Sequence, residues 1–239
     1  MEIIISSIIN DLKLDNEEIT NIYNYGSWVY GTNHEKSDRD FLFITNIKNE
    51  NERKSLKFED DFDYFHSFDL RRLNNCDVTI HSCENFELLL EKNYMLAVEC
   101  LFYPNEFIIR NNIDYKTIYL TKYYNSLRLK QVIFYENNHS FKYVMDDDDD
   151  NEINSHSYIN PTIDQFLCNA IQTTTIDEDR LLKYLFHGLR YLDIGEQLIR
   201  TKSIHNFKRI SYILFHIKDI YINNNKNMDF VIDYMKTKQ

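Results

Sequence analysis

The sequence predicts an α+β protein, in which a mixed sheet flanked by helices is followed by a mainly helical C-terminal half. Two observations lead to this prediction. Helical and strand-like patterns alternate through about residue 110, and beyond residue 113 long stretches have helical spacing with few strand signals. We therefore expect a first domain at residues 1–112 and a helical domain at residues 113–239.

The N-terminal half opens with a helical pattern and continues with strand-like runs. Apolar residues at 4–12 recur at helical spacing, and the short apolar segment around Ile22 follows as a strand. Compact apolar or β-branched runs predict two further strands at residues 41–44 and 78–80. Residues 86–96 then return to helical spacing, so strand and helix alternate through this half of the chain.

The C-terminal half contains four long stretches that are compatible with helices. These stretches cover residues 115–135, 162–173, 179–198 and 207–222. An acidic tract with five consecutive aspartates separates the first two, and its composition predicts a solvated loop near residues 145–156.

The composition argues against several classes of protein. A formal charge of −11 disfavours binding along extended duplex DNA, because that mode needs many Lys and Arg to displace counterions from phosphates. The apolar run at residues 1–10 is too short to span a bilayer, so we expect a cytoplasmic protein without membrane association. The four cysteines lack metal-site spacing and predict reduced, mostly buried thiols.

Two of the four glycines, Gly26 and Gly31, lie within six residues of each other in a chain that otherwise avoids glycine. After a strand, Gly26 would let the backbone approach a ligand closely, and Ser27 would cap a short helix with its hydroxyl facing an anion. Gly31 suits the left-handed position that ends such a helix. The segment therefore predicts a phosphate-binding turn at Gly26 and Ser27.

A pair of carboxylates follows this turn and leads into the strand at residues 41–44. On an extended backbone, Asp38 and Asp40 would lie on one face about 7 Å apart and repel each other. Mg²⁺ or Mn²⁺, which prefer oxygen ligands, would relieve that repulsion and bridge the carboxylates to a triphosphate. Arg39 would point to the opposite face, where we expect an ion pair.

A third acidic ligand is expected from the next strand. Asp77 opens the run at residues 78–80, and a strand beside residues 40–44 would bring its carboxylate to the same metal pair. Asp77 would then act as a general base or as a ligand of the second metal. We expect Asp38, Asp40 and Asp77 to be the catalytic residues.

These motifs resemble the signature of the DNA polymerase β-like nucleotidyltransferase superfamily. The resemblance rests on Gly26-Ser27, on Tyr30-Gly31-Thr32 and on Ser37-Asp38-x-Asp40. The continuation is most similar to the predicted nucleotidyltransferases of the RNA repair group, with Asp77 on a strand followed by a helix, Asn93 and Glu99. The group's Gly-Asn-Pro element is replaced here by Lys92-Asn93-Tyr94, which changes the expected loop.

A basic helix face in the C-terminal half completes the predicted site. Lys183, His187 and Arg190 have spacings of four and three residues, which place them on one face of a helix. The resemblance implies a similar Lys, His and Arg helix that contacts the triphosphate or the acceptor, so all three are predicted nucleotide-binding residues. The residues alone are equally compatible with a solvated basic face.

Together, these features predict an enzyme that transfers a nucleoside monophosphate from a nucleoside triphosphate, with ATP among the candidates, to an acceptor hydroxyl and releases pyrophosphate. The acceptor is open: an RNA end, a protein or a small molecule. Two alternatives also stay open. One is a non-catalytic module that binds a nucleotide or a protein on the same fold, and the other is an antitoxin-like enzyme that modifies a protein.

Overall fold

The structure is a computed structural model that describes residues 2–46, 71–73, 76–142 and 178–237. The acidic loop expected near residues 145–156 and the helix expected at residues 162–173 lie outside these ranges. Within the described ranges, no helix is both long and apolar enough to cross a membrane.

The chain divides into two compact units. The first unit is Met1–Leu129 together with Thr201–Lys208, and the second is Lys130–Arg200 together with Arg209–Gln239. The first unit thus extends beyond residue 112, to Leu129, and it also includes the short segment Thr201–Lys208. The boundary near residue 112 stays a prediction for the domain division.

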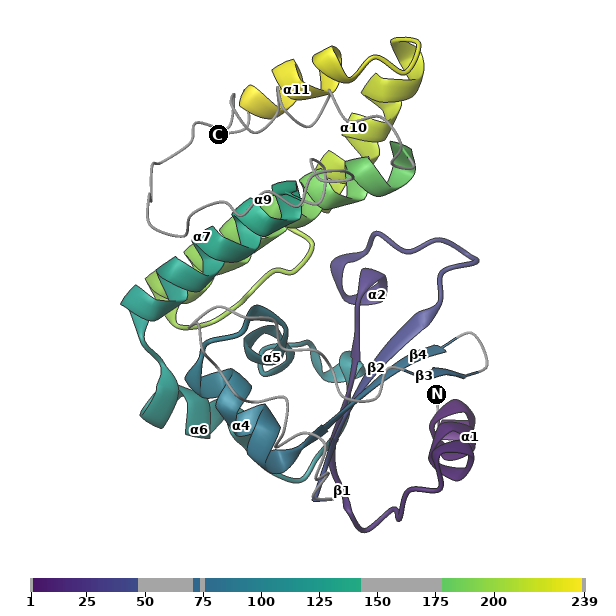
Figure 1. Ribbon diagram of the computed structural model, residues 1–239, viewed down its shortest axis with the longest axis vertical. Coiled ribbons are helices and arrows are strands. Elements are labelled where there is room, and N and C mark those ends of the chain that lie inside the picture. Colours follow the sequence, from purple (N-terminus) through teal and green to yellow (C-terminus); the bar gives the residue numbers. More distant parts are fainter. Residues whose placement is uncertain (1, 47–70, 74–75, 143–177, 238–239) are drawn as a thin grey trace, which may run out of the picture. The chain divides into compact units, whose positions relative to one another are not determined.

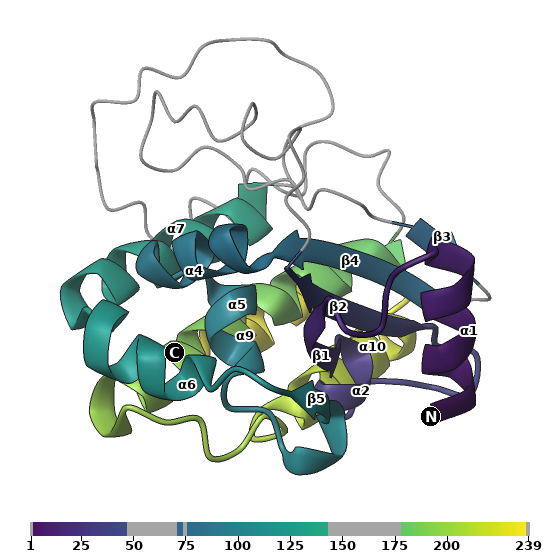
Figure 2. The same cartoon turned by 90° about the horizontal axis from the view of Figure 1, so that it is seen from below.

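A five-stranded sheet forms the centre of the first unit, with the strand order β3-β4-β2-β1-β5 (Figures 1 and 2). The strands are β1 (Ile19–Tyr25), β2 (Arg39–Thr45), β3 (Arg71–Leu73), β4 (Cys76–Ser82) and β5 (Ile108–Asn111). β2 and β4 are parallel, and the other neighbours are antiparallel. The sheet is therefore mixed, which confirms the predicted α+β class.

Helices cover both faces of this sheet. They are α1 (Glu2–Leu12), α2 (Ser27–Tyr30), α4 (Cys83–Glu91), α5 (Met95–Cys100) and α6 (Tyr115–Ile118), followed by a π-helical turn at Tyr119–Tyr123; a 3₁₀ turn at Asn105–Phe107 precedes β5. Ile8 of α1 belongs to one buried cluster with Phe41 and Val78 of the sheet. On the other face, the ring of Tyr23 stacks with Phe86 of α4 at a centroid distance of 6.4 Å. Alternation along each strand thus assigns one set of side chains to each face.

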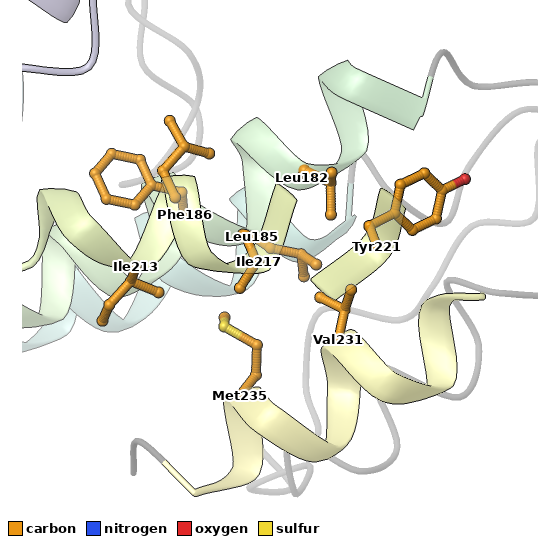
Figure 3. Close-up of a cluster of buried hydrophobic side chains, with 9 residues drawn as sticks. Leu182, Leu185, Phe186, Ile213, Ile217, Tyr221, Val231 and Met235 are labelled. Atoms are coloured by element: carbon orange, nitrogen blue, oxygen red, sulfur yellow. The ribbon is translucent and has the colours of Figure 1, made fainter. Parts of the chain in front are cut away.

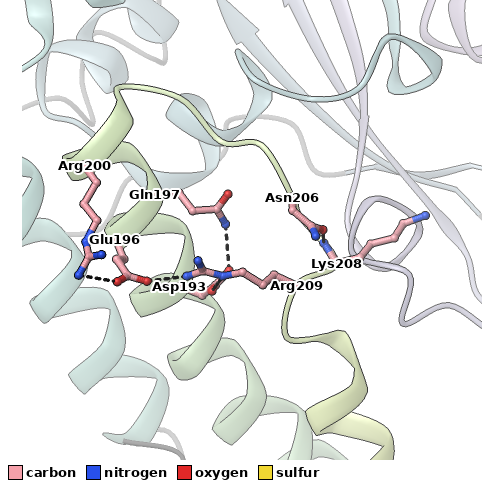
Figure 4. A network of polar contacts seen from close by, with 7 residues as sticks. All are labelled: Asp193, Glu196, Gln197, Arg200, Asn206, Lys208 and Arg209. Atoms are coloured by element: carbon pink, nitrogen blue, oxygen red, sulfur yellow. Dashed lines mark hydrogen bonds and ion pairs between the residues drawn. The ribbon is translucent and has the colours of Figure 1, made fainter.

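The second unit consists of helices in its described part. It contains most of α7 (Ser126–Lys142) and nearly all of α9 (Glu178–Thr201), with α10 (Ser211–Asn223) and α11 (Met228–Lys236). Figure 3 shows their apolar core, in which Phe186 of α9, Ile217 of α10 and Met235 of α11 are buried in one cluster. Arg209 binds both Asp193 and Glu196 of α9 (Figure 4). The mainly helical C-terminal half is thereby confirmed for the described residues.

Candidate active site

The turn between β1 and β2 is built around two glycines with positive φ. Gly26 precedes α2 with φ 80° and ψ −154°, and Gly31 ends it in the left-handed conformation with φ 67° and ψ 26°. Thr32 donates its backbone N–H to the carbonyl of Ser27 at 3.0 Å. The left-handed role predicted for Gly31 is correct. Ser27, however, is the first residue of α2 and makes no side-chain capping bond, so the predicted capping role is wrong.

The carboxylate of Asp40 occupies the space that a side chain at Gly26 would need. A β-carbon built on Gly26 would lie 1.9 Å from Oδ2 of Asp40 and 3.0 Å from its Cγ. Real β-carbons essentially never show a contact as short as 1.9 Å, so only glycine fits here without displacing the carboxylate. The glycine turn and β2 are therefore in contact at Gly26 and Asp40.

The sheet register brings the other predicted carboxylate beside Asp40. Asp40 of β2 pairs with Asp77 of β4 in the parallel ladder and with Tyr25 of β1 in the antiparallel one. Paired residues on neighbouring strands direct their side chains to the same face of a sheet. The strand beside residues 40–44 therefore places Asp77 next to Asp40, and its role as a third ligand stays a prediction.

The three carboxylates influence one another electrostatically. The pKa of Asp40 is raised from 3.8 to about 7, mainly by burial and further by the negative charges of Asp38 and Asp77. Close like charges stabilise the protonated form of a carboxyl group, and a bound cation would reverse this effect. The raised pKa of Asp40 thus reflects first its burial and second the two negative charges beside it at this edge of the sheet.

Tyr25 and Thr79 lie next to the carboxylates on the same face. The hydroxyl of Tyr25 is 3.1 Å from Oγ1 of Thr79, which is two residues beyond Asp77 on β4. Burial raises the pKa of the Tyr25 hydroxyl, and the charges of Asp40 and Asp77 add to this increase. The tyrosine is therefore a neutral neighbour of the carboxylates. The position of Tyr25 beside the carboxylates was not predicted, because it follows only from the register in which β1 pairs with β2.

The donor set of Asp38, Asp40 and Asp77 suits a hard divalent cation, because all their donor atoms are carboxylate oxygens. Within the described part of the chain, no group of three or more His, Cys, Asp or Glu side chains is arranged to hold a metal ion as it stands. Mutual repulsion separates carboxylates when no cation is between them. The chemistry of these residues fits a divalent metal ion, and Asp38, Asp40 and Asp77 are the residues that would hold it.

Asn93 and Glu99 have structural surroundings. Asn93 follows the C-cap of α4 with φ 57° and is fully buried, and its Oδ1 accepts a hydrogen bond of 2.7 Å from the hydroxyl of Tyr119. Glu99 of α5 is 1% exposed and accepts a hydrogen bond from the hydroxyl of Tyr30 in α2. Asn93, with its positive φ, lies in the loop where the family has Gly-Asn-Pro. Glu99 contacts the glycine turn through its hydrogen bond with Tyr30.

The predicted basic face of α9 belongs to the second unit and is not uniformly exposed. Lys183 is exposed, whereas Arg190 is 5% exposed, with its guanidinium 4.5 Å from the ring centroid of Tyr191. His187 is half-buried, and burial together with the charges of Arg190 and Lys183 lowers its pKa to about 3. The three side chains are near one another, and their role in nucleotide binding stays a prediction.

The model of the nucleotidyltransferase domain family matches residues 5–145, which is more than half of the 239 residues, and the chain belongs to this family. The predicted membership of the DNA polymerase β-like superfamily is thereby confirmed, and the placement in the RNA repair group stays a prediction. Family membership supports nucleotidyl transfer as the general function. No curated protein shows significant sequence similarity to the chain.

Proposed function

We propose that the protein transfers a nucleoside monophosphate from a nucleoside triphosphate to an acceptor hydroxyl, with Mg²⁺ or Mn²⁺ as cofactor and release of pyrophosphate. The contact between Gly26 and Asp40 carries this proposal, because it brings the turn that we propose to bind phosphate next to the strand with the acidic motif. The pairing of Asp40 with Asp77 supplies the third carboxylate.

In this proposal, each part of the site has a separate task. The backbone at Gly26 and the hydroxyl of Ser27 hold the phosphates of the nucleotide. Asp38, Asp40 and Asp77 hold the divalent ions, which supply charge neutralisation at the triphosphate and activation of the acceptor hydroxyl. Asp77 orients the acceptor or accepts its proton.

The proposed partners follow from charge and from the family. A net charge of −11 favours compact acceptors, such as an RNA end, a protein or a small molecule, over extended duplex DNA. In the second unit, Lys183, His187 and Arg190 are proposed to contact the triphosphate. Of these three, Lys183 is the exposed side chain. Lys183→Ala therefore tests the contact with the least disturbance of packing, through an increased KM for the nucleotide.

The test incubates the protein with each labelled triphosphate, Mg²⁺ or Mn²⁺ and a cell extract, and then identifies the labelled macromolecule. Transfer should stop in EDTA and in Asp38→Ala and Asp40→Ala, and should persist in the exposed control Asp15→Ala, which has the same change of side chain. Label in RNA supports an RNA acceptor, whereas label in polypeptide supports the antitoxin-like alternative. Transfer at the parental rate in both site variants would refute the mechanism.

A non-catalytic binding module would behave differently. It would bind a labelled triphosphate at equilibrium without transferring the label to any acceptor in the extract. Because a binding module has no need for three neighbouring carboxylates, the arrangement of Asp38, Asp40 and Asp77 favours the enzyme.

A further inference from the structure

Two side chains hold the backbone carbonyls of the two motif aspartates. Nε1 of Trp28 donates a hydrogen bond of 2.9 Å to the carbonyl of Asp38, and Nδ2 of Asn24 donates one of 2.9 Å to the carbonyl of Asp40. Trp28 comes from α2 and Asn24 from β1. Separate elements thus fix the backbone on either side of Arg39.

Arg39 connects these two side chains. Its guanidinium lies 4.1 Å from the ring centroid of Trp28, and Nη1 donates a hydrogen bond of 3.2 Å to Oδ1 of Asn24. The side chain between the two aspartates therefore touches both groups that hold their carbonyls. The structure shows these two contacts for Arg39, and the predicted ion pair stays a prediction. We call Asn24, Trp28 and Arg39 together the carbonyl clamp.

The clamp acts where the sheet gives the least support. β2 begins at Arg39, so Asp38 precedes the strand, while Asp40 is the second residue of the strand. A backbone outside the ladder has fewer hydrogen bonds to restrict it, and its side chain is correspondingly less well placed. The indole N–H of Trp28 supplies a hydrogen bond at this position. Asn24, which is fully buried, is held in turn by the sheet.

We propose that Asn24, Trp28 and Arg39 are positioning residues, which set the backbone of Asp38 and Asp40 so that both carboxylates reach one divalent cation. This inference rests on the proposed function, because it assigns the clamp to the same metal-dependent site. The three side chains need no contact with the metal or the nucleotide. Groups that orient metal ligands typically change affinity by about 10-fold to 100-fold when they are removed.

The test measures Mn²⁺ binding to the full chain in the absence of nucleotide, by electron paramagnetic resonance of the free ion. Trp28→Phe keeps an aromatic face for Arg39 but removes the donor to Asp38, and Arg39→Met removes the connection between Trp28 and Asn24. Each variant should bind Mn²⁺ about 10-fold more weakly or worse. Arg39→Lys, which keeps the charge over the ring, should recover part of the affinity.

Arg110→Met is the matched control. Arg110 also holds backbone carbonyls, those of Asn16 and Ile19 at 2.9 and 3.0 Å, but at a different part of the sheet. Its loss should lower the melting temperature and leave Mn²⁺ affinity at the parental value. Melting curves in EDTA establish that each variant is folded, and Trp28→Phe carries the test if Arg39→Met does not fold.

The outcomes separate the clamp from the proposed function. Parental binding that disappears in Asp40→Ala but is unchanged in Trp28→Phe and Arg39→Met would overturn the clamp and leave the proposed function intact. Absence of any Mn²⁺ binding that depends on Asp40 would overturn both. Weaker binding in the clamp variants, with parental affinity in Arg110→Met, supports positioning rather than a general loss of stability.

Discussion

The carboxylate of Asp40 lies directly against the α-carbon of Gly26, where a β-carbon would be 1.9 Å from Oδ2. The two residues are fourteen positions apart in the sequence, and the antiparallel pairing of β1 with β2 brings them together. Because Gly26 has no side chain, the carboxylate of Asp40 can occupy this space.

Gly26→Ala should lower activity by about 100-fold at a modest loss of stability. The new methyl group would displace the Asp40 carboxylate, and the backbone at φ 80° and ψ −154° lies in a region that is essentially restricted to glycine, so an L-residue there would be strained by about 1–3 kcal/mol. A displacement of about 1 Å at a catalytic group lowers the rate by about 100-fold. Urea unfolding and the transfer assay measure the two effects.

Gly31→Ala provides the control for this prediction. Gly31 has a similar φ of 67°, but its hypothetical β-carbon meets the flexible side chain of Lys208, with Cδ at 3.1 Å. At this left-handed position, with ψ 26°, the strain should cost about 1–2 kcal/mol, and most of the activity should remain. Equal activity losses in the two variants would show that strain in the turn, rather than the contact with Asp40, is responsible.

Much of the site could be predicted because its determinants are local. Two glycines within a span of six residues and an Asp-x-Asp pair before an apolar run are visible in the sequence. The pairing of Asp40 with Asp77 depends on the register of parallel strands, which residue patterns do not specify until neighbours are known. The clamp contacts of Asn24 were missed for the same reason, although a polar residue within the β1 segment was a signal.

The fold shows a similar division. Long periodic segments such as α9 and the buried β2 were predicted close to their observed limits. β5 has four residues, none of them buried, so no apolar alternation marked it. β3 has three residues, which is too short for a pattern to be recognised. α11 was missed because it follows the polar residues 223–227, where the last predicted helical stretch ended.

Asp77→Asn should lower the pKa of Asp40 from its value of about 7. Asp77 contributes one of the negative charges that stabilise the protonated form, and its removal leaves burial and Asp38 as the remaining causes. The pKa should therefore fall but stay above the ordinary value for Asp. Carboxyl ¹³C resonances, followed during a pH titration in metal-free buffer, measure it directly.

Asp15→Asn is the matched substitution for this titration, because Asp15 is exposed and is absent from the groups that shift Asp40. The Asp40 titration should be the same as in the parent. If Asp77→Asn also leaves the titration unchanged, Asp77 does not act on Asp40, and the three-carboxylate site is refuted.

His81 should make the protein less stable in acid. Burial lowers its pKa in the folded state from 6.5 to about 4, and Nδ1 lies 2.9 Å from Nδ2 of Asn85. As the pH falls from 6.5 towards 4, the unfolded chain binds a proton that the folded chain does not, so stability is lost across this window. The loss from His81 amounts to about 3 kcal/mol at most.

Urea unfolding between pH 4 and pH 7.5 tests this dependence. His81→Gln, which keeps an acceptor for Asn85, should flatten the acid side of the stability curve, and other titrating groups cancel in the difference from the parent. His205→Gln changes an exposed histidine and should give the parental curve. An unchanged slope in His81→Gln would mean that His81 does not resist protonation in the folded protein.

Tyr30→Phe should reduce stability without removing activity. The hydroxyl of Tyr30 donates to Glu99, a carboxylate that is 1% exposed, and removing a donor from a buried carboxylate costs about 1–3 kcal/mol. Because neither group is assigned to the metal or the nucleotide, kcat should stay within a few-fold of the parent. Tyr212→Phe, at a tyrosine that is 55% exposed, should change neither quantity. A large fall in kcat with parental stability would contradict this prediction and would assign Glu99 to the chemistry. Glu99 is part of the element, with Asp77 and Asn93, on which the resemblance to the RNA repair group rests.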